Sequence, residues 1–184
     1  MPVRSRQWKE RHYASYVASL ARPGGNVTGF TLIEYGLSAK WLELLKEIAP
    51  DVKRVAVLRD PSIASGVGQF AIIQSVAPSF GVEAIPMDVR NTDEIERAIR
   101  VFASTSNGGL IVAASPAALV HRKLIITLAT QHKLPTVYYS RDLVKDGGLI
   151  SYGADSITAY AQAASYVSRI LKGEKPADLP VQET

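Results

Sequence analysis

The chain contains no cysteine, which excludes disulfide frameworks, thiol nucleophiles and cysteine-bound metals together. Its three histidines, His12, His121 and His132, are too few and too widely spaced for a histidine metal site. We therefore expect no metal ion and no cofactor. No uninterrupted apolar run approaches the length of a membrane span, although 47% of the 184 residues are apolar. This composition is typical of one ordinary globular domain.

The net charge of +4 is confined to the start of the chain. Residues 1–22 carry five basic side chains and one acidic side chain, and the rest of the chain is neutral. A neutral body has no basic groove for a phosphate backbone, so we predict no nucleic-acid partner. The N-terminus also lacks an apolar stretch followed by a small-residue cleavage site, which predicts a cytoplasmic location for the chain as written.

From residue 37 onward, helical periodicity alternates with short apolar, β-branched runs. This pattern predicts an α/β fold with a doubly wound, mostly parallel sheet and helices on both of its faces. We expect a basic leader at 1–24, an α/β ligand-binding lobe at 25–154, and a C-terminal helix with an extended, poorly tied-down tail at 155–184. The predicted strands are 53–58, 82–87, 109–113, 136–139 and 149–152. The predicted helices begin or end near 37–48, 66–79, 91–102, 116–132 and 155–171.

Residues that are typical of helix ends support these boundaries. Asn91 and Asp155 are expected to cap their helices, and Ser115-Pro116 is a strong helix-start signal. The helix from 116 to about 132 has apolar residues all around its axis, so we expect it to be well buried. The last helix instead has a single apolar stripe, formed by Tyr160, Ala163, Ala164, Val167, Ile170 and Leu171.

Open parallel sheets bind ligands outside the carboxyl ends of their strands, where helix N-termini also present free N–H groups. In this chain the segments after the strands are polar, and they include the residues Asp60, Ser62, Ser65, Asp88, Arg90, Asn91, Ser115, Tyr139, Ser140, Arg141 and Asp142. This edge suits a small polar ligand. Each serine, aspartate or asparagine also has a simpler role available, which is to cap its own helix, and that alternative stays open.

One segment matches the spacing of a dinucleotide-binding fingerprint. Residues 66–71 match G-x-G-x-x-A, and Asp88 lies where a ribose-binding carboxylate belongs. Seven residues separate the preceding strand from Gly66, however, whereas the fingerprint glycine forms the tight turn directly after its strand. A small flavodoxin-like or nucleotide-binding enzyme is therefore an alternative function only. The other common catalytic motifs are missing from the sequence, so we predict no catalytic residues.

A family resemblance is carried by several separate segments. They are Val17 to Gly36, with its Ala21-Arg22-Pro23-Gly24-Gly25-Asn26-Val27-Thr28-Gly29 run, Leu42 to Pro50, Lys53 to Leu58, Gly147 to Gly153, and Ile170 to Val181. Together they resemble the bacterial ABC-transporter solute-binding proteins of the tryptophan-binder type, over about residues 17–181. The resemblance implies a type I periplasmic binding fold, in which three strands cross between two doubly wound lobes.

The chain matches mainly the second of those lobes. The resemblance implies that Asn26 to Phe30 is the first crossing, Leu149 to Tyr152 the second, and Leu179 to Val181 the start of the third. It also implies a non-catalytic solute-binding component of an ABC-type importer, with an ABC permease as partner and a periplasmic or membrane-anchored location. An effector-sensing interaction domain is a further alternative for a lobe of this type.

In the resembling family, the ligand contacts of the second lobe come from the loops after its strands. At those positions the chain carries Ser62, Ser115, Pro116, Tyr139, Ser140 and Arg141. Hydroxyls and the N–H groups after Pro116 suit a carboxylate, and Tyr139 suits stacking on a flat ligand. Several tryptophan-type members have threonine and aspartate after that proline, whereas this chain has Ala117 and Ala118. The expected ligand is therefore a small polar or amino-acid-like solute.

Two expectations follow from having mainly one lobe. A cleft with one wall forms about half of the ligand contacts, so this chain alone is expected to bind solutes weakly. The apolar stripe of the 155–171 helix also needs a partner, which predicts a homodimer formed through that helix.

Overall fold

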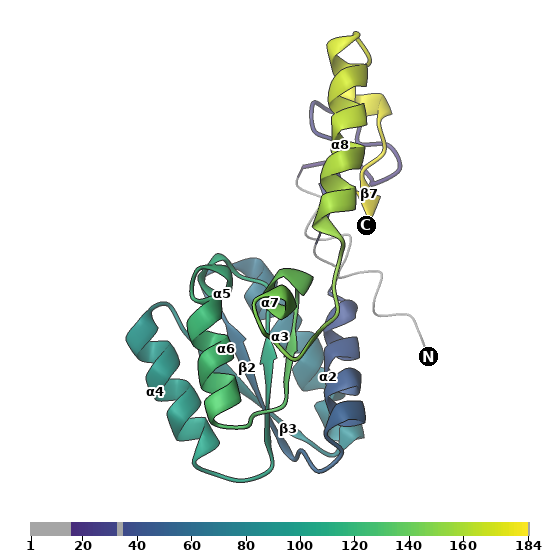
Figure 1. Cartoon of the computed structure of the whole chain (residues 1–184). Coiled ribbons are helices and arrows are strands. Elements are labelled where there is room, and N and C mark those ends of the chain that lie inside the picture. The colour runs from purple at the N-terminus through teal and green to yellow at the C-terminus, as the bar shows by residue number, and fades with distance from the viewer. Residues whose placement is uncertain (1–15, 33–34, 184) are drawn as a thin grey trace. The chain divides into compact units, whose positions relative to one another are not determined.

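The computed structural model describes residues 16–32 and 35–183, and it divides into two compact units (Figure 1). Of the described residues, 16–32 and 154–183 form unit 1, and 35–153 form unit 2. The sequence placed the lobe at 25–154, whereas the described residues 25–32 group with unit 1. The boundary after residue 153 lies one residue before the predicted end of the lobe at 154. His12 and most of the basic leader lie outside the described residues.

Unit 2 is built on a five-stranded parallel sheet with the order β3-β2-β4-β5-β6. Its strands are β2 (Arg54–Arg59), β3 (Glu83–Asp88), β4 (Gly108–Val112), β5 (Thr136–Tyr138) and β6 (Ile150–Ser151). In order of sequence this is the 2-1-3-4-5 arrangement of flavodoxin-like folds. The predicted α/β class, the parallel sheet and the positions of these five strands to within two residues are thereby confirmed.

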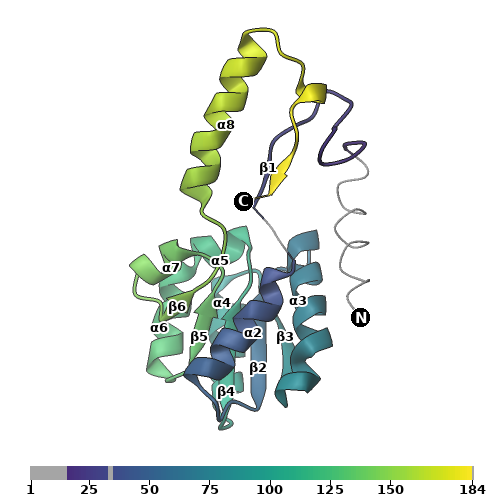
Figure 2. The same ribbon diagram turned by 90° about the vertical axis from the view of Figure 1, so that its right-hand side faces the viewer.

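Helices cover both faces of this sheet, as Figures 1 and 2 show. The helices of unit 2 are α2 (Leu37–Ile48), α3 (Ala64–Val76), η1 (Ala77–Phe80), α4 (Thr92–Ala103), α5 (Pro116–Val120), α6 (Arg122–Gln131) and α7 (Arg141–Lys145). On one face, Trp41 and Leu45 of α2 pack with Phe70 of α3 against the strands. On the other face, Ile95 of α4 and Ile125 of α6 belong to a second cluster. The sheet is therefore doubly wound, as predicted.

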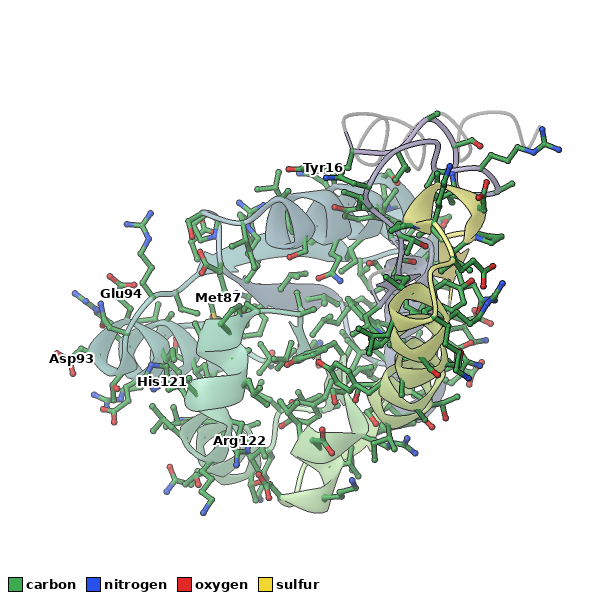
Figure 3. The ribbon with its side chains drawn as sticks, turned by 90° about the horizontal axis from the view of Figure 1, so that it is seen from above. Tyr16, Met87, Asp93, Glu94, His121 and Arg122 are labelled. Atoms are coloured by element: carbon green, nitrogen blue, oxygen red, sulfur yellow. The ribbon has the colours of Figure 1, made fainter. Side chains whose placement is uncertain are left out.

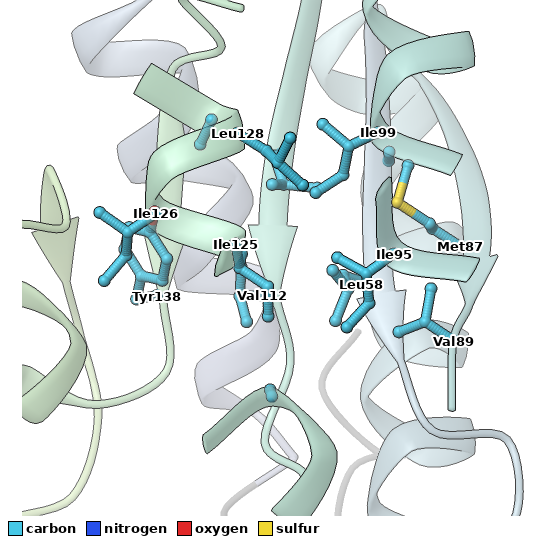
Figure 4. Close-up of a cluster of buried hydrophobic side chains, with 14 of the residues drawn as sticks. Leu58, Met87, Val89, Ile95, Ile99, Val112, Ile125, Ile126, Leu128 and Tyr138 are labelled. Carbon is cyan, nitrogen blue, oxygen red and sulfur yellow. The ribbon is translucent and has the colours of Figure 1, made fainter. Parts of the chain in front are cut away.

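The second cluster is the larger of the two cores and is shown in Figure 4. Leu58 and Val112 from adjacent strands meet Ile95 and Ile125 from the helices above them, and all four side chains are fully buried. Strands β2 and β4 are apolar on both faces because helices cover each side of the sheet.

The edge strand β3 contains a proline. Glu83 N–H donates to Lys53 and Val89 N–H donates to Arg59, so the odd-numbered residues of β3 turn their backbone groups toward β2. Pro86 is therefore at a position that faces away from the neighbouring strand. Its missing N–H removes no bond from the sheet, which is why a proline is tolerated there.

The region between 116 and 132 corrects one prediction. A single buried helix was expected, but α5 ends at Val120 and α6 begins at Arg122, with His121 between them at φ −96° and ψ 15°. Arg122 Nη1 donates to the carbonyl of Leu119 at 3.0 Å, which satisfies an acceptor that the break frees. Leu119 and Val120 are exposed, so only the second half of the region is buried as predicted.

Unit 1 consists of α8 (Ser156–Leu171), the strands β1 (Phe30–Thr31) and β7 (Gln182–Glu183), and η2 (Pro176–Asp178). The two strands pair in parallel, as Figure 2 shows. The tail was predicted to be poorly tied down, and this was wrong: Leu179 is fully buried, and Thr28 Oγ1 donates to its carbonyl at 2.6 Å. Among the described residues, no helix combines the length and apolar character needed to cross a bilayer.

Candidate functional site

The candidate site is the edge of unit 2 where its parallel strands end. Each strand there leads into a loop, and most of these loops lead into the N-terminus of a helix. Figure 3 looks down on this edge, with Asp93 and Glu94 at the start of α4 and His121 and Arg122 at the α5–α6 junction. All six predicted ligand-binding residues lie in the loops or first helical turns of this edge, after β2, β4 and β5. Their role in binding stays a prediction.

The loop after β2 is organised by a carboxylate. Asp60 Oδ1 accepts bonds from the hydroxyl of Ser62 at 2.6 Å and from its N–H at 2.9 Å. Both bonds lower the pKa of Asp60 below its ordinary value, and the bond from the Ser62 hydroxyl has the larger effect. The Ser62 hydroxyl donates within the loop, and its oxygen keeps lone pairs that can accept a bond from a ligand.

The loop after β4 is held by a buried glutamine. Gln69 of α3 is almost fully buried, and its Oε1 accepts the N–H of Ala114 at 3.0 Å. The hydroxyl oxygen of Ser115 accepts the N–H of Ala118 at 3.0 Å, so Ser115 caps α5 as its sequence position indicated. Sequence reasoning missed Gln69, although a lone amide on an otherwise apolar helix face was a signal for it.

The same capping bond revises one expectation about the site. The N–H groups after Pro116 were expected to be available for a carboxylate. Ala118 N–H donates to Ser115 Oγ, and Leu119 N–H donates to the Ser115 carbonyl at 3.2 Å. Two of these donors therefore serve the helix start. The Ser115 hydroxyl, which accepts one bond, still has a proton to donate.

The loop after β5 supplies an aromatic ring and a guanidinium. Tyr139 packs against both apolar cores, and burial raises the pKa of its phenol above the ordinary value, with Asp142 adding to the effect and Arg122 opposing it. Ser140 caps α7 by accepting the N–H of Asp142 at 3.3 Å. Arg141, the first residue of that helix, is exposed at the edge.

The last loop of the edge is fixed by contacts that the sequence did not reveal. Trp41 Nε1 donates to the carbonyl of Tyr152 at 2.6 Å. A Cβ atom placed on Gly153 would come within 2.0 Å of the Tyr139 carbonyl oxygen, so only glycine fits there. These contacts hold the end of β6 against α2 and against the loop after β5.

The structure does not support the dinucleotide fingerprint. Gly66 lies inside α3, where a Cβ would approach the Asp60 carbonyl oxygen to 2.3 Å, and a Cβ on Gly68 would meet the Tyr35 ring at 2.3 Å. Both glycines are thus explained by close packing. Asp88, the expected ribose ligand, is paired with Arg59 at 2.6 Å. These observations remove the basis of the nucleotide-binding alternative.

Two surface hollows lie on unit 2, and the first of them reaches Asp88 and Glu94 at the carboxyl edge. One of about 640 Å³ runs between β3 and α4, beside Arg54 and Phe102, and one of about 340 Å³ lies beside Lys133 and Gly147. Within the part of the chain that the structure describes, no three histidine or acidic side chains gather as a metal site would require. The carboxyl edge thus offers hydroxyls, a guanidinium and an aromatic ring on a rigid frame, and these groups suit a small ligand with a carboxylate.

A family model and a curated relative match most of this chain. Residues 13–184 match the model of the family described as ABC transporter substrate binding protein. The tyrosine-binding protein of Clostridioides difficile is 26% identical over 176 residues, which is 91% of this chain and 48% of that protein.

Two solved structures share the fold at similar identity. The ABC domain of Streptococcus pneumonia in complex with L-Trp is 26% identical with a TM-score of 0.78, over 93% of this chain and 58% of that one. A conserved domain protein of Vibrio cholerae is 27% identical with a TM-score of 0.82, over 93% and 57% of the two chains. The chain thus spans about half the length of the relatives that it matches.

Proposed function

Since this chain belongs to the ABC transporter substrate-binding protein family, we propose that it binds a small solute at the carboxyl edge of unit 2 and does so without catalysis. The observation that carries the proposal is the arrangement of that edge. Its loops follow neighbouring parallel strands, so Ser62, Ser115 and Arg141 lie at the same edge of the sheet. The edge of such a sheet is where α/β folds bind their ligands.

The proposed ligand is an amino acid or a similar small carboxylate. Arg141 supplies a charge that a carboxylate can pair with, and the hydroxyl of Ser115 can donate to the same group. Tyr139 offers an apolar ring beside them. A relative is named for binding tyrosine and another was solved with L-Trp, which supports this ligand class over sugars or metal ions.

The proposal extends to the partners and place of action that suit such a protein. A solute bound at this edge would be passed to an ABC permease on the outer side of the cytoplasmic membrane. Because the chain spans about half of its relatives' length, it supplies part of the contacts that a complete cleft would make. We expect dissociation constants on the order of 1 mM, equivalent to about −4 kcal/mol of binding free energy.

Amide chemical-shift mapping by NMR tests this proposal with the whole chain. L-Trp, L-Tyr and L-Leu are titrated to millimolar levels, with D-glucose as the unrelated solute. Shifts that cluster at 60–63, 114–116 and 139–141 and weaken in Arg141→Met support the proposal. Arg100→Met is the matched control, because Arg100 is another exposed guanidinium, on α4 and away from these loops. Shifts confined to the hollow beside Arg54, or tight binding that Arg141→Met leaves unchanged, would contradict it.

A further inference from the structure

The hollow between the edge strand β3 and helix α4 has the size of a ligand site. Its volume of about 640 Å³ is within the range of small-molecule pockets. Its lining includes both Glu94 and Ser104, so it runs for about 15 Å along the helix. Every lining residue belongs to the stretch 54–105, so unit 2 alone supplies both walls.

The middle of this hollow is apolar. Ile85 and Met87 of β3 form one wall, and Ala98 and Val101 of α4 belong to the other. Val101 is 66% exposed and is the one apolar residue among the exposed positions of α4. The hollow can therefore cover the hydrocarbon part of a ligand.

The hollow also contains an arginine without a counter-ion. The guanidinium carbon of Arg54 lies 4.6 Å from the centroid of the Phe102 ring, and its Nη1 is buried without a hydrogen-bond partner. Among the described residues, no acidic side chain forms an ion pair with Arg54, although Glu83 is its neighbour across the strands. An arginine stacked on an aromatic ring in this way keeps the planar fork of N–H groups that matches a carboxylate.

The position of that arginine is fixed by the packing beneath it. Gly108 of β4 is the register partner of Arg54. A Cβ atom on Gly108 would come within 2.8 Å of the Phe102 ring. The missing side chain at this position thus gives the ring its place against the sheet, where it supports the guanidinium.

The acidic groups that line the hollow are already engaged. Asp88 is paired with Arg59 at 2.6 Å, and Glu94 Oε2 accepts a backbone N–H at 2.8 Å at the start of α4. Arg97, in contrast, forms no ion pair with any residue that the structure describes. The charges left for a ligand are those of Arg54 and Arg97, which favour an anion.

We propose that this hollow binds a small amphipathic anion, with its carboxylate on Arg54 and its apolar body along Ile85 and Val101. A medium-chain fatty acid has this chemistry. A free amino acid fits less well, because its ammonium group would be repelled by Arg54 and Arg97. The site is separate from the loops that carry Ser115 and Arg141, and it does not depend on solute binding there.

Amide chemical-shift mapping of the whole chain with octanoate tests the proposal. Millimolar octanoate should shift the amides of 54, 85–87 and 97–105, whereas acetate and octylammonium should shift them little. Arg54→Met should weaken octanoate binding by at least about tenfold, because it removes the charge and keeps an apolar side chain beside Phe102. Arg100→Met is the matched control, since Arg100 is an exposed arginine of α4 that does not line the hollow.

A second variant tests the same site at its surface, where the fold tolerates change. Val101→Glu places a carboxylate beside the apolar body of the ligand and should weaken octanoate binding. Val120→Glu is its control, because Val120 is 73% exposed on α5 and lies outside the hollow. The proposal is overturned if octanoate leaves the amides of the hollow unshifted, or if octylammonium binds there equally well. Octanoate binding that both Arg54→Met and Val101→Glu leave unchanged would also overturn it.

Discussion

The two units of this protein differ in how much of their apolar surface they bury themselves. Unit 2 has two packed cores, one on each face of its sheet. In the described part of unit 1, the buried hydrophobic residues are Val17, Ala159, Tyr166 and Leu179. Its strands β1 and β7 are two residues long, and an isolated two-stranded sheet is marginally stable in water. Unit 2 thus has the core of a self-sufficient domain, whereas the described part of unit 1 buries few apolar side chains.

Truncating a buried leucine in each unit should give the largest difference between the two units. Leu110 and Leu179 are both fully buried, in unit 2 and unit 1 respectively. Leu110→Ala should lower the free energy of unfolding of unit 2 by about 2–5 kcal/mol, because it leaves a cavity in a packed core. Leu179→Ala should leave that transition in place and loosen unit 1 alone.

Urea unfolding followed by the fluorescence of Trp41 reports the first effect, in a Trp8→Phe background, because Trp41 is buried in unit 2. Leu119→Ala is the control, since Leu119 is exposed. If Leu179→Ala shifted the Trp41 transition as far as Leu110→Ala does, the two units would unfold as one and the comparison would fail.

Raising the pH into the alkaline range should also lower the stability of unit 2. Burial raises the pKa of Tyr138 to about 12, so the folded state disfavours its phenolate. Between about pH 10 and pH 12 the unfolded chain releases this proton and the folded chain keeps it. Stability should therefore be constant below pH 10 on this account and fall by roughly 1.4 kcal/mol per pH unit above it.

The measurement is urea unfolding at several alkaline pH values, with Tyr138→Phe as the variant that removes the titrating group. The variant should lose this part of the pH dependence. Equal slopes in the two proteins between pH 10 and pH 12 would show that Tyr138 does not carry the effect.

Alanine substitutions at two glycines compare a site where the backbone is closely packed with a site where it is open. Gly66→Ala should cost about 1–3 kcal/mol, because its Cβ would lie 2.3 Å from the rigid Asp60 carbonyl. Gly25→Ala in unit 1 should cost little, since no atom lies within 4 Å of the added Cβ. Thermal unfolding of both variants measures the difference. If Gly66→Ala left the stability unchanged, close packing would not explain the glycine at this position.

The smallest expected effect concerns helix caps. Asn91 Oδ1 accepts the N–H of Glu94 at 3.0 Å, and Asp155 Oδ1 accepts the N–H of Ile157 at 3.0 Å. Each alanine substitution should cost about 1 kcal/mol. Asn91→Ala should shift the unfolding of unit 2, whereas Asp155→Ala should speed amide exchange in α8 and leave the Trp41 signal unchanged. A shift of the Trp41 signal in Asp155→Ala would show that the units are coupled.

The sequence predicted the elements of unit 2 closely because each has its own local signal. Asn91 and Ser115 mark helix starts by side-chain chemistry that depends on near neighbours alone. Strand β2 is buried on both faces, so its apolar run is continuous. The break at His121 has no glycine or proline to announce it, because Arg122 stabilises it through a contact with Leu119 that periodicity does not show.

The candidate site was only partly predictable for a related reason. Its location follows from strand order, and Ser62, Ser115 and Arg141 lie where the sequence placed them. The residues that hold its loops, Gln69 and Trp41, act across 45 and 111 residues of chain, which no local pattern encodes. The same limit applies to α8: periodicity found an apolar stripe, but only packing shows that Tyr166 faces its own unit.

The outward-facing proline of β3 bears on how copies of this molecule can meet. A parallel sheet has open edges, and an open edge offers a row of unpaired donors and acceptors on which a strand of another molecule can assemble. On the outward side of β3 the N–H groups belong to Ala84 and Asp88, because Pro86 between them has none. The gap interrupts the row at its middle, which disfavours the pairing of this edge with a strand of another molecule.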